Sequence, residues 1–172
     1  MAAGLPDLVD CARLGSDAAS LERVYSLSEL PRVQDVLAGP QGSVKAAFAF
    51  SRAPSGRSAA RVSVRAEPQL VCQRCMKGFA FPVRSGSEVE FTNDEDATAS
   101  EPERELFKSE AGMVSLRALA EEELLLALPF AAACGDPQSC GNAPCIGAAQ
   151  GPELSGEMRR PFSALQDLLK KT

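Results

Sequence analysis

The stretch SVKAAFAF, residues 43–50, carries an apolar side chain at every second position. That period is typical of a β-strand with one buried face, here formed by Val44, Ala46, Phe48 and Phe50. The stretch RVSVRAE, residues 61–67, alternates in the same way and turns its arginines to the opposite face. Because Pro54, Ser55 and Gly56 are turn-forming residues, the two stretches are predicted to pair as a hairpin.

Strand patterns resume beyond residue 78, with a predicted break at Ser85–Gly86. Their apolar faces are Phe79, Phe81 and Val83, and then Val89 and Phe91. Together with the hairpin, these stretches predict an antiparallel β meander of about four strands, with one face in water. The fold class expected is therefore α+β, a meander packed with a few helices.

The clearest helix is predicted within MVSLRALAEEELLLALPF, residues 113–130. Ser115 is a suitable N-cap and Pro129 marks the exit, while a buried stripe is expected from Leu116, Leu119, Leu124 and Leu128. Shorter helical segments are expected within residues 19–25 and 30–37 and near the C-terminus, at residues 159–171. The three consecutive glutamates Glu121–Glu123 point about 100° apart on a helix, so they cannot converge on one atom. A solvated face with at most one inward carboxylate is the favoured interpretation.

The length of 172 residues suits a single domain, residues 1–172. The acidic run at residues 93–105 is predicted to be a mobile loop, and residues 131–158, rich in Gly, Pro and Ala, a cysteine-containing loop. The sequence contains neither a run of about 18 apolar residues nor a pattern like a signal peptide. A soluble, cytoplasmic protein without membrane contact is therefore expected.

Charge is segregated along the chain although the net charge is only −5. Residues 45–84 hold eight basic side chains and one acid, a balance of +7, whereas residues 85–123 hold twelve acids and three basic side chains, a balance of −9. Such asymmetry suits one face that meets a polyanion. The alternative is that the two runs are solvated faces that neutralise each other.

The sequence has six cysteines and no histidine, so a metal site would have to use sulfur or oxygen. Cys72 and Cys75 form a C-x2-C pair, in which Gly78 is expected to ease the turn. Structural zinc takes four ligands, and further thiols are available in Cys134, Cys140 and Cys145. The predicted ligands of a structural Zn²⁺ are Cys72, Cys75, Cys134 and Cys140, with Cys145 open as the alternative to Cys140.

The cysteines have two other interpretations. A thioredoxin-type redox pair belongs where a strand enters a helix in a βαβ unit, and this pair lies among antiparallel strands. Inert, buried thiols are the other interpretation, and it is the one that suits Cys11. Four thiolates around zinc would form a closed structural site that pins the loop at residues 131–146 to the turn at residues 72–75.

Three motifs in this order, LVCQRCMKGF, EEELLLALPF and PFSALQDLLKK, resemble the bacterial YceD family of large ribosomal RNA subunit accumulation proteins, which has relatives in plastids. The resemblance covers roughly residues 25–172. It implies support of large-subunit ribosomal RNA synthesis, processing or stability. Family members commonly carry a histidine where this chain has Cys134, and exchange of imidazole for thiolate preserves a zinc ligand.

The function expected is that of a non-catalytic ribosome-biogenesis factor with no small-molecule substrate. Its partners would be ribosomal RNA, a pre-ribosomal particle or ribosomal proteins. The basic face expected to meet them consists of Lys45, Arg61, Arg65, Arg74, Lys77 and Arg84. Two alternatives remain: a metal-dependent RNA-processing enzyme that uses carboxylates among Glu88, Glu90 and Glu121–Glu123, and an adaptor that binds proteins through its acidic loop.

Overall fold

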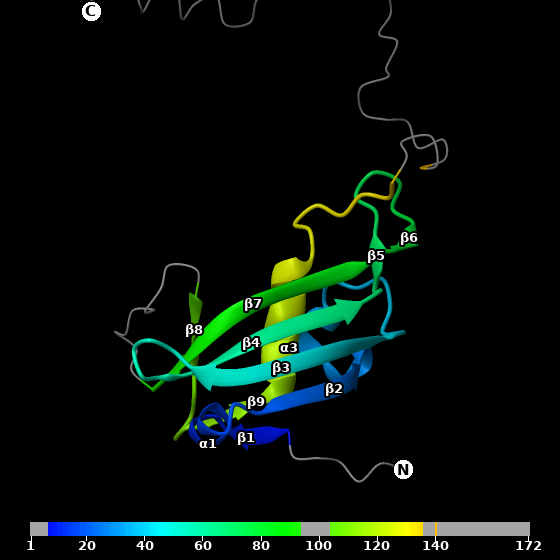
Figure 1. Ribbon diagram of the computed structural model, residues 1–172. Coiled ribbons are helices and arrows are strands. Elements are labelled where there is room, and N and C mark those ends of the chain that lie inside the picture. The colour runs from blue at the N-terminus through cyan, green and yellow to red at the C-terminus, as the bar shows by residue number, and fades with distance from the viewer. Residues whose placement is uncertain (1–6, 94–103, 136–139, 141–172) are drawn as a thin grey trace, which may run out of the picture. The chain divides into compact units, whose positions relative to one another are not determined.

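The computed structural model describes residues 7–93, 104–135 and 140, all of which belong to one compact unit, Met1–Gly141. Its centre is a five-stranded sheet in the order β2-β3-β4-β7-β8 (Figure 1). The strands are β2 (Ser20–Ser26), β3 (Ser43–Arg52), β4 (Ser58–Ala66), β7 (Val83–Thr92) and β8 (Arg104–Lys108). All neighbours are antiparallel except β7 and β8, which are parallel. The predicted α+β class is confirmed.

The hairpin of β3 and β4 forms as the alternation predicts. Phe48 lies opposite Val62, and Val44 lies opposite Ala66, so the apolar side chains of both strands share one face. The connecting turn contains Gly56, whose φ of 80° suits a residue without a Cβ atom. This pair places the fully buried Phe48 at the centre of the core.

The structure differs from the sequence-based expectations in three places. Residues 19–25 were expected to be helical, but β2 pairs with β3 along its whole length, because Leu21 and Tyr25 satisfy a period of two when the edge of β3 is available. No break occurs at Ser85–Gly86, where β7 runs straight through and Gly86 lies opposite Ser63. β8 was not predicted, because it is short and charged.

The predicted acidic loop at residues 93–105 is only partly covered by the structure. Residues 94–103 lie outside the described part of the chain, while Arg104 and Glu105 begin β8. β8 is held to β7 by parallel pairing and by an edge-to-face contact between Phe91 and Phe107. The last two residues of the expected loop therefore belong to the sheet.

The helix α3 (Leu116–Ala127) packs on one face of the sheet, against β4 and β7 (Figure 1). Ser115 caps it as predicted, because its side chain accepts a hydrogen bond from the backbone of Ala118. Leu116, Leu119 and Leu124 are buried against the strands. The opposite face of β2, β3, β4 and β7 thus stays free of α3.

Short elements complete the described unit. They are β1 (Leu8–Asp10), α1 (Cys11–Ser16), a 3-10 turn (Leu27–Glu29), α2 (Pro31–Gln34), β5 (Gln69–Val71), β6 (Gly78–Ala80) and β9 (Met113–Ser115). The two-stranded sheets pair β1 with β9 and β5 with β6. α2 lies within residues 30–37, where a helix was expected; the helix expected at residues 159–171 lies outside the described residues. No helix in the described part of the chain is long and apolar enough to span a membrane.

Candidate metal centre and basic face

Four cysteines from two distant parts of the sequence meet at the end of the β5–β6 hairpin. Their Sγ atoms all lie within 4.8 Å of one another: Cys72, Cys75, Cys134 and Cys140. The separation is 3.9 Å for Cys72 and Cys140, 3.9 Å for Cys75 and Cys134, and 2.9 Å for Cys134 and Cys140. Among the described residues this is the one group of three or more potential ligands that could hold a metal ion.

The backbone of the β5–β6 turn aims two of these sulfurs at one point. Cys72 N–H donates to the carbonyl of Lys77 at 2.9 Å, and Met76 N–H donates to the carbonyl of Cys72 at 2.8 Å. Met76 takes the left-handed conformation, with φ 57°, so the turn depends on this residue and not on the predicted Gly78, which pairs within β6. The turn is therefore a tight, internally bonded loop between two strands.

The second pair of cysteines follows the exit of α3. The segment after Pro129 is bound to the turn by a hydrogen bond from Gln73 N–H to the carbonyl of Ala132 at 2.8 Å. Cys134 N–H and Arg74 N–H both point at the Cys72 sulfur, at 3.3 Å and 3.4 Å. Amide groups arranged in this way favour a thiolate over a thiol, and a thiolate is the form that binds metal.

The four thiols differ in acidity. Hydrogen bonds from the backbone of Cys134 and then of Cys75 lower the pKa of the Cys72 thiol to about 5. The pKa of Cys140 is raised to about 12, chiefly by its hydrogen bond to the Cys134 side chain and also by burial. Four like charges at these distances repel one another, so a bound cation would be needed to ionise all four together.

Cys11 lies apart from the cluster, as predicted. It is buried in the core, and its Sγ lies 3.0 Å from the carbonyl oxygen of Gly112. Burial raises the pKa of this thiol. Cys145 is outside the described residues, whereas Cys140 joins the other three cysteines.

Arg74 and Lys77 flank the cysteine turn but differ in their contacts. The guanidinium of Arg74 donates to the carbonyl oxygens of Cys134 and Gly135, and so it ties the turn to the loop after α3. Lys77 is exposed. Both side chains were expected to meet an anionic partner, and the contacts give Arg74 a role inside the cysteine site.

Three other basic residues of the expected face form a row across the sheet. Lys45 lies opposite Arg65, and Arg65 lies opposite Arg84, so the three side chains share the face that α3 does not cover. All three are exposed, and none forms an ion pair with a described residue. We call Lys45, Arg65 and Arg84 the basic row.

Arg61 lies on the same face but in a different environment. Its guanidinium is paired with Glu88, which also binds Arg104 at 3.0 Å. These contacts link β4, β7 and β8 by charge. Arg61 therefore contributes less free positive charge to the face than the basic row does.

The prediction that at most one of the three glutamates of α3 points inward is wrong. Glu121 and Glu123 are both buried, with 6% and 4% of their surface exposed. Glu121 accepts hydrogen bonds from the backbone of Arg32 and Val33, and Glu123 accepts from the hydroxyls of Ser85 and Ser87. Glu122 forms an ion pair with Arg32 at the surface. The three carboxylates thus face three different sets of partners, as their 100° spacing requires.

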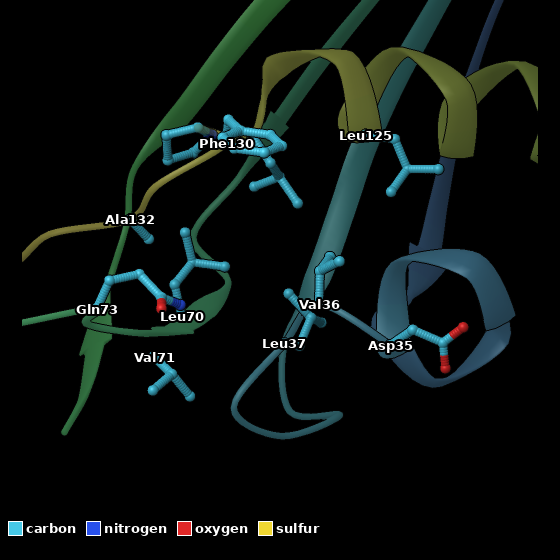
Figure 2. Close-up of a pocket in the computed structure, with 11 residues that line it drawn as sticks. Asp35, Val36, Leu37, Leu70, Val71, Gln73, Leu125, Phe130 and Ala132 are labelled. Atoms are coloured by element: carbon cyan, nitrogen blue, oxygen red, sulfur yellow. The ribbon is translucent and has the colours of Figure 1, made fainter. Parts of the chain in front are cut away.

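An apolar pocket that the sequence did not predict lies beside the cysteine cluster. It has a volume of about 600 Å³, and Figure 2 shows Leu125 and Phe130 on one side and Val36 and Leu37 on another. Phe130 is fully exposed. The exit of α3, the chain after α2 and β5 together form it, and such a combination of loops has no periodic signal in a sequence.

Comparison with protein-family models gives a match. A family model described as "Large ribosomal RNA subunit accumulation protein YceD" matches residues 60–169. This range includes most of β4, the cysteine turn, β7 and α3. No curated protein and no solved structure matches the chain significantly.

Proposed function

The chain belongs to the YceD family of large ribosomal RNA subunit accumulation proteins, and we propose that it is a non-catalytic factor that contacts RNA or a ribosomal partner through its basic sheet face. Membership implies a role in the accumulation of large-subunit ribosomal RNA. On our proposal, the protein supports the synthesis, processing or stability of that RNA in the cytoplasm by binding, without cutting or modifying it.

The basic row carries this proposal. Like charges directly opposite each other on neighbouring strands destabilise a sheet. Here three cations lie side by side across β3, β4 and β7, and no described carboxylate pairs with them. A polyanion would relieve this repulsion, because each phosphate that a cation neutralises also releases counterions. The row therefore favours a partner rich in phosphate.

We further propose that the four cysteines bind one structural Zn²⁺. Zinc–sulfur bonds of about 2.3 Å in a tetrahedron place the sulfur atoms roughly 3.8 Å apart. Two of the Sγ separations are 3.9 Å, and small movements would bring the others to this value. Four thiolates around a divalent cation carry a net charge of about −2, and the adjacent guanidinium of Arg74 offsets part of it.

The described carboxylates give little support to a nuclease. Glu88 binds Arg61 and Arg104, Glu90 binds Arg57, and Glu121–Glu123 have the separate partners described above. A two-metal nuclease needs carboxylates that converge on ions about 4 Å apart. Among the described residues, the ligand group that converges is the cysteine cluster, and these carboxylates form no such group.

The proposal is tested with Arg65→Glu, which reverses the central charge of the basic row. A matched control is Arg13→Glu, which reverses an exposed arginine on α1. We expect Arg65→Glu to weaken binding of the full-length protein to large-subunit ribosomal RNA fragments at low salt, and to reduce large-subunit ribosomal RNA when it replaces the native protein in cells. If both variants bind RNA and support its accumulation like the native protein, the proposed role of this face is wrong.

A further inference from the structure

A shallow trough runs across the open face of the sheet beside the basic row. Its floor is the next row of side chains, in which Ala47 lies opposite Ser63 and Ser63 lies opposite Gly86. The β2 to β4 part of the trough is a groove of about 510 Å³. The residues that line this groove are Glu22, Arg23, Val24, Lys45, Ala46, Ala47, Ser63 and Arg65.

The strand geometry sets the width of the trough. Side chains on one face recur every second residue, about 7 Å apart along a strand. The basic row forms one wall, and Arg61 and Glu88, four residues from it along β4 and β7, form the other, so the walls lie roughly 14 Å apart. Three consecutive small residues across the strands keep the space between these walls open.

Gly86 makes the floor especially low on β7. A Cβ atom at this position would lie 3.1 Å from the carbonyl oxygen of Val62 and 3.4 Å from the Cβ of Ser63. A glycine inside a strand weakens the strand, and it often marks a place where another backbone or a ligand comes close. Gly86 therefore keeps the β7 end of the floor clear.

We propose that this trough seats one single strand of RNA by its sugar-phosphate backbone. The inference rests on the proposed function and names its partner more closely. Phosphates would lie along the basic row, which spans about 10 Å across three strands, and the hydroxyl of Ser63 offers a hydrogen bond to a phosphate or a ribose. Lys45 and Arg65 line the groove together, so positive charge lies where the phosphates would pass.

The same geometry argues against a duplex and against base-specific recognition. An RNA duplex is too wide to enter a trough of about 14 Å between side-chain rows, so it would touch only the rim. Specific recognition of single strands commonly stacks bases on aromatic rings. The described face of β2, β3, β4 and β7 opposite α3 carries no aromatic side chain, so bases would not be stacked there. Glu22, opposite Ala47 at the β2 end of the groove, repels phosphate, so the phosphates would lie toward β3, β4 and β7.

A matched pair of leucine substitutions tests the trough. Ala47→Leu fills its floor, whereas Ala49→Leu adds the same side chain two residues along β3, on the same face but outside the groove. Binding of the full-length variants to a short unstructured oligoribonucleotide, and to a duplex of equal length, is measured by fluorescence anisotropy. Circular dichroism melts serve as the control that both variants are folded.

The expected results are specific. Three phosphate contacts on a single strand predict that native affinity falls about 20-fold between 50 and 200 mM salt. We expect Ala47→Leu to weaken single-strand binding about tenfold at 50 mM salt and to lower the salt dependence, because fewer phosphates reach the row. Ala49→Leu should bind like the native protein, and the duplex should bind more weakly than the single strand.

Other outcomes separate the inference from the proposed function. If Arg65→Glu abolishes binding while Ala47→Leu leaves it unchanged, the face binds RNA but the trough does not seat it. The trough inference is then wrong, and the proposed function is retained. Equal binding of duplex and single strand has the same consequence. If neither the native protein nor any variant binds RNA, the inference and direct RNA contact fall together, and a protein partner for the face remains.

Discussion

The carboxylate of Glu121, on α3, lies 2.7 Å from the backbone nitrogen of Arg32, in the first turn of α2. The same oxygen is 3.3 Å from the backbone nitrogen of Val33. A helix leaves its first N–H groups without partners, and here a side chain almost ninety residues away supplies the acceptor. The buried glutamate thereby fixes α2 against α3.

This contact predicts different effects for two adjacent glutamates. Glu121→Ala leaves two backbone N–H groups, one part-buried and one buried, without this acceptor and should lower the free energy of unfolding by about 1–3 kcal/mol. Glu122→Ala removes only an exposed ion pair with Arg32 and should cost about 1 kcal/mol or less. Urea unfolding followed by circular dichroism measures both. Equal losses for the two variants would contradict the role of Glu121.

The cysteine cluster predicts about one zinc per chain, because four thiolates complete a tetrahedral site. Cys72→Ser should remove most of this zinc, whereas Cys11→Ala should retain it, because Cys11 lies in the core away from the cluster. Metal analysis of protein purified without added chelator measures the content. Native protein without metal, or equal zinc in Cys72→Ser and Cys11→Ala, would exclude the site.

Tyr25 predicts a loss of stability in alkali. Its hydroxyl donates a hydrogen bond to Asp7 at 2.8 Å, and burial, followed by this contact, raises the pKa of Tyr25 well above its ordinary value of 10.0. The folded protein thus keeps the neutral phenol, while the unfolded chain releases the proton at about pH 10. The contribution to stability is complete below pH 10 and is lost as the pH rises above it.

The measurement is direct because Tyr25 is the single tyrosine and the chain has no tryptophan. Ultraviolet absorbance of the phenolate should rise well above pH 10 in folded protein and near pH 10 in urea. Thermal melts from neutral to alkaline pH should show a steeper loss for native protein than for Tyr25→Phe, in which lysines and cysteines still titrate. A phenolate that forms near pH 10 in the folded state would refute this account.

The sequence predicted those parts of the structure that depend on local period and capping. The alternation in residues 43–50 predicted β3 and its buried face, and Ser115 predicted the start of α3. The cluster of Cys72, Cys75, Cys134 and Cys140 was expected from ligand chemistry, and the structure brings these sulfur atoms together. The spacing of nearby residues and the preference of zinc for four ligands were sufficient to predict these features.

The features that were missed depend on contacts between distant residues. β2 is a strand because β3 offers an edge for it to pair with. The spacing of the apolar residues within these seven positions is equally compatible with a helix. Glu121 and Glu123 are buried because Arg32, Ser85 and Ser87 satisfy them, and glutamates in a row ordinarily indicate a solvated face. The basic row also depends on register, because Lys45, Arg65 and Arg84 become neighbours only when three strands pair.

Arg74 and Lys77 are adjacent to the same turn, but of the two only Arg74 contacts the loop after α3. Its guanidinium binds the carbonyls of Cys134 and Gly135, so Arg74→Ala should loosen the segment that carries half of the thiolates. Loss of a side chain that supports metal ligands typically lowers metal affinity about 10- to 100-fold. We therefore expect Arg74→Ala to lose zinc to a chromogenic chelator at a much lower chelator concentration than native protein.

Lys77→Ala is the matched control, since it removes one positive charge from the same turn and leaves the loop contacts intact. It should hold zinc like native protein, and the two variants should weaken RNA binding to a similar, small extent if the turn contributes only charge. Should Lys77→Ala release zinc as readily as Arg74→Ala, the effect would be due to general charge near the thiolates. A difference between the two shows that the hydrogen bonds of Arg74 keep Cys134 beside Cys72.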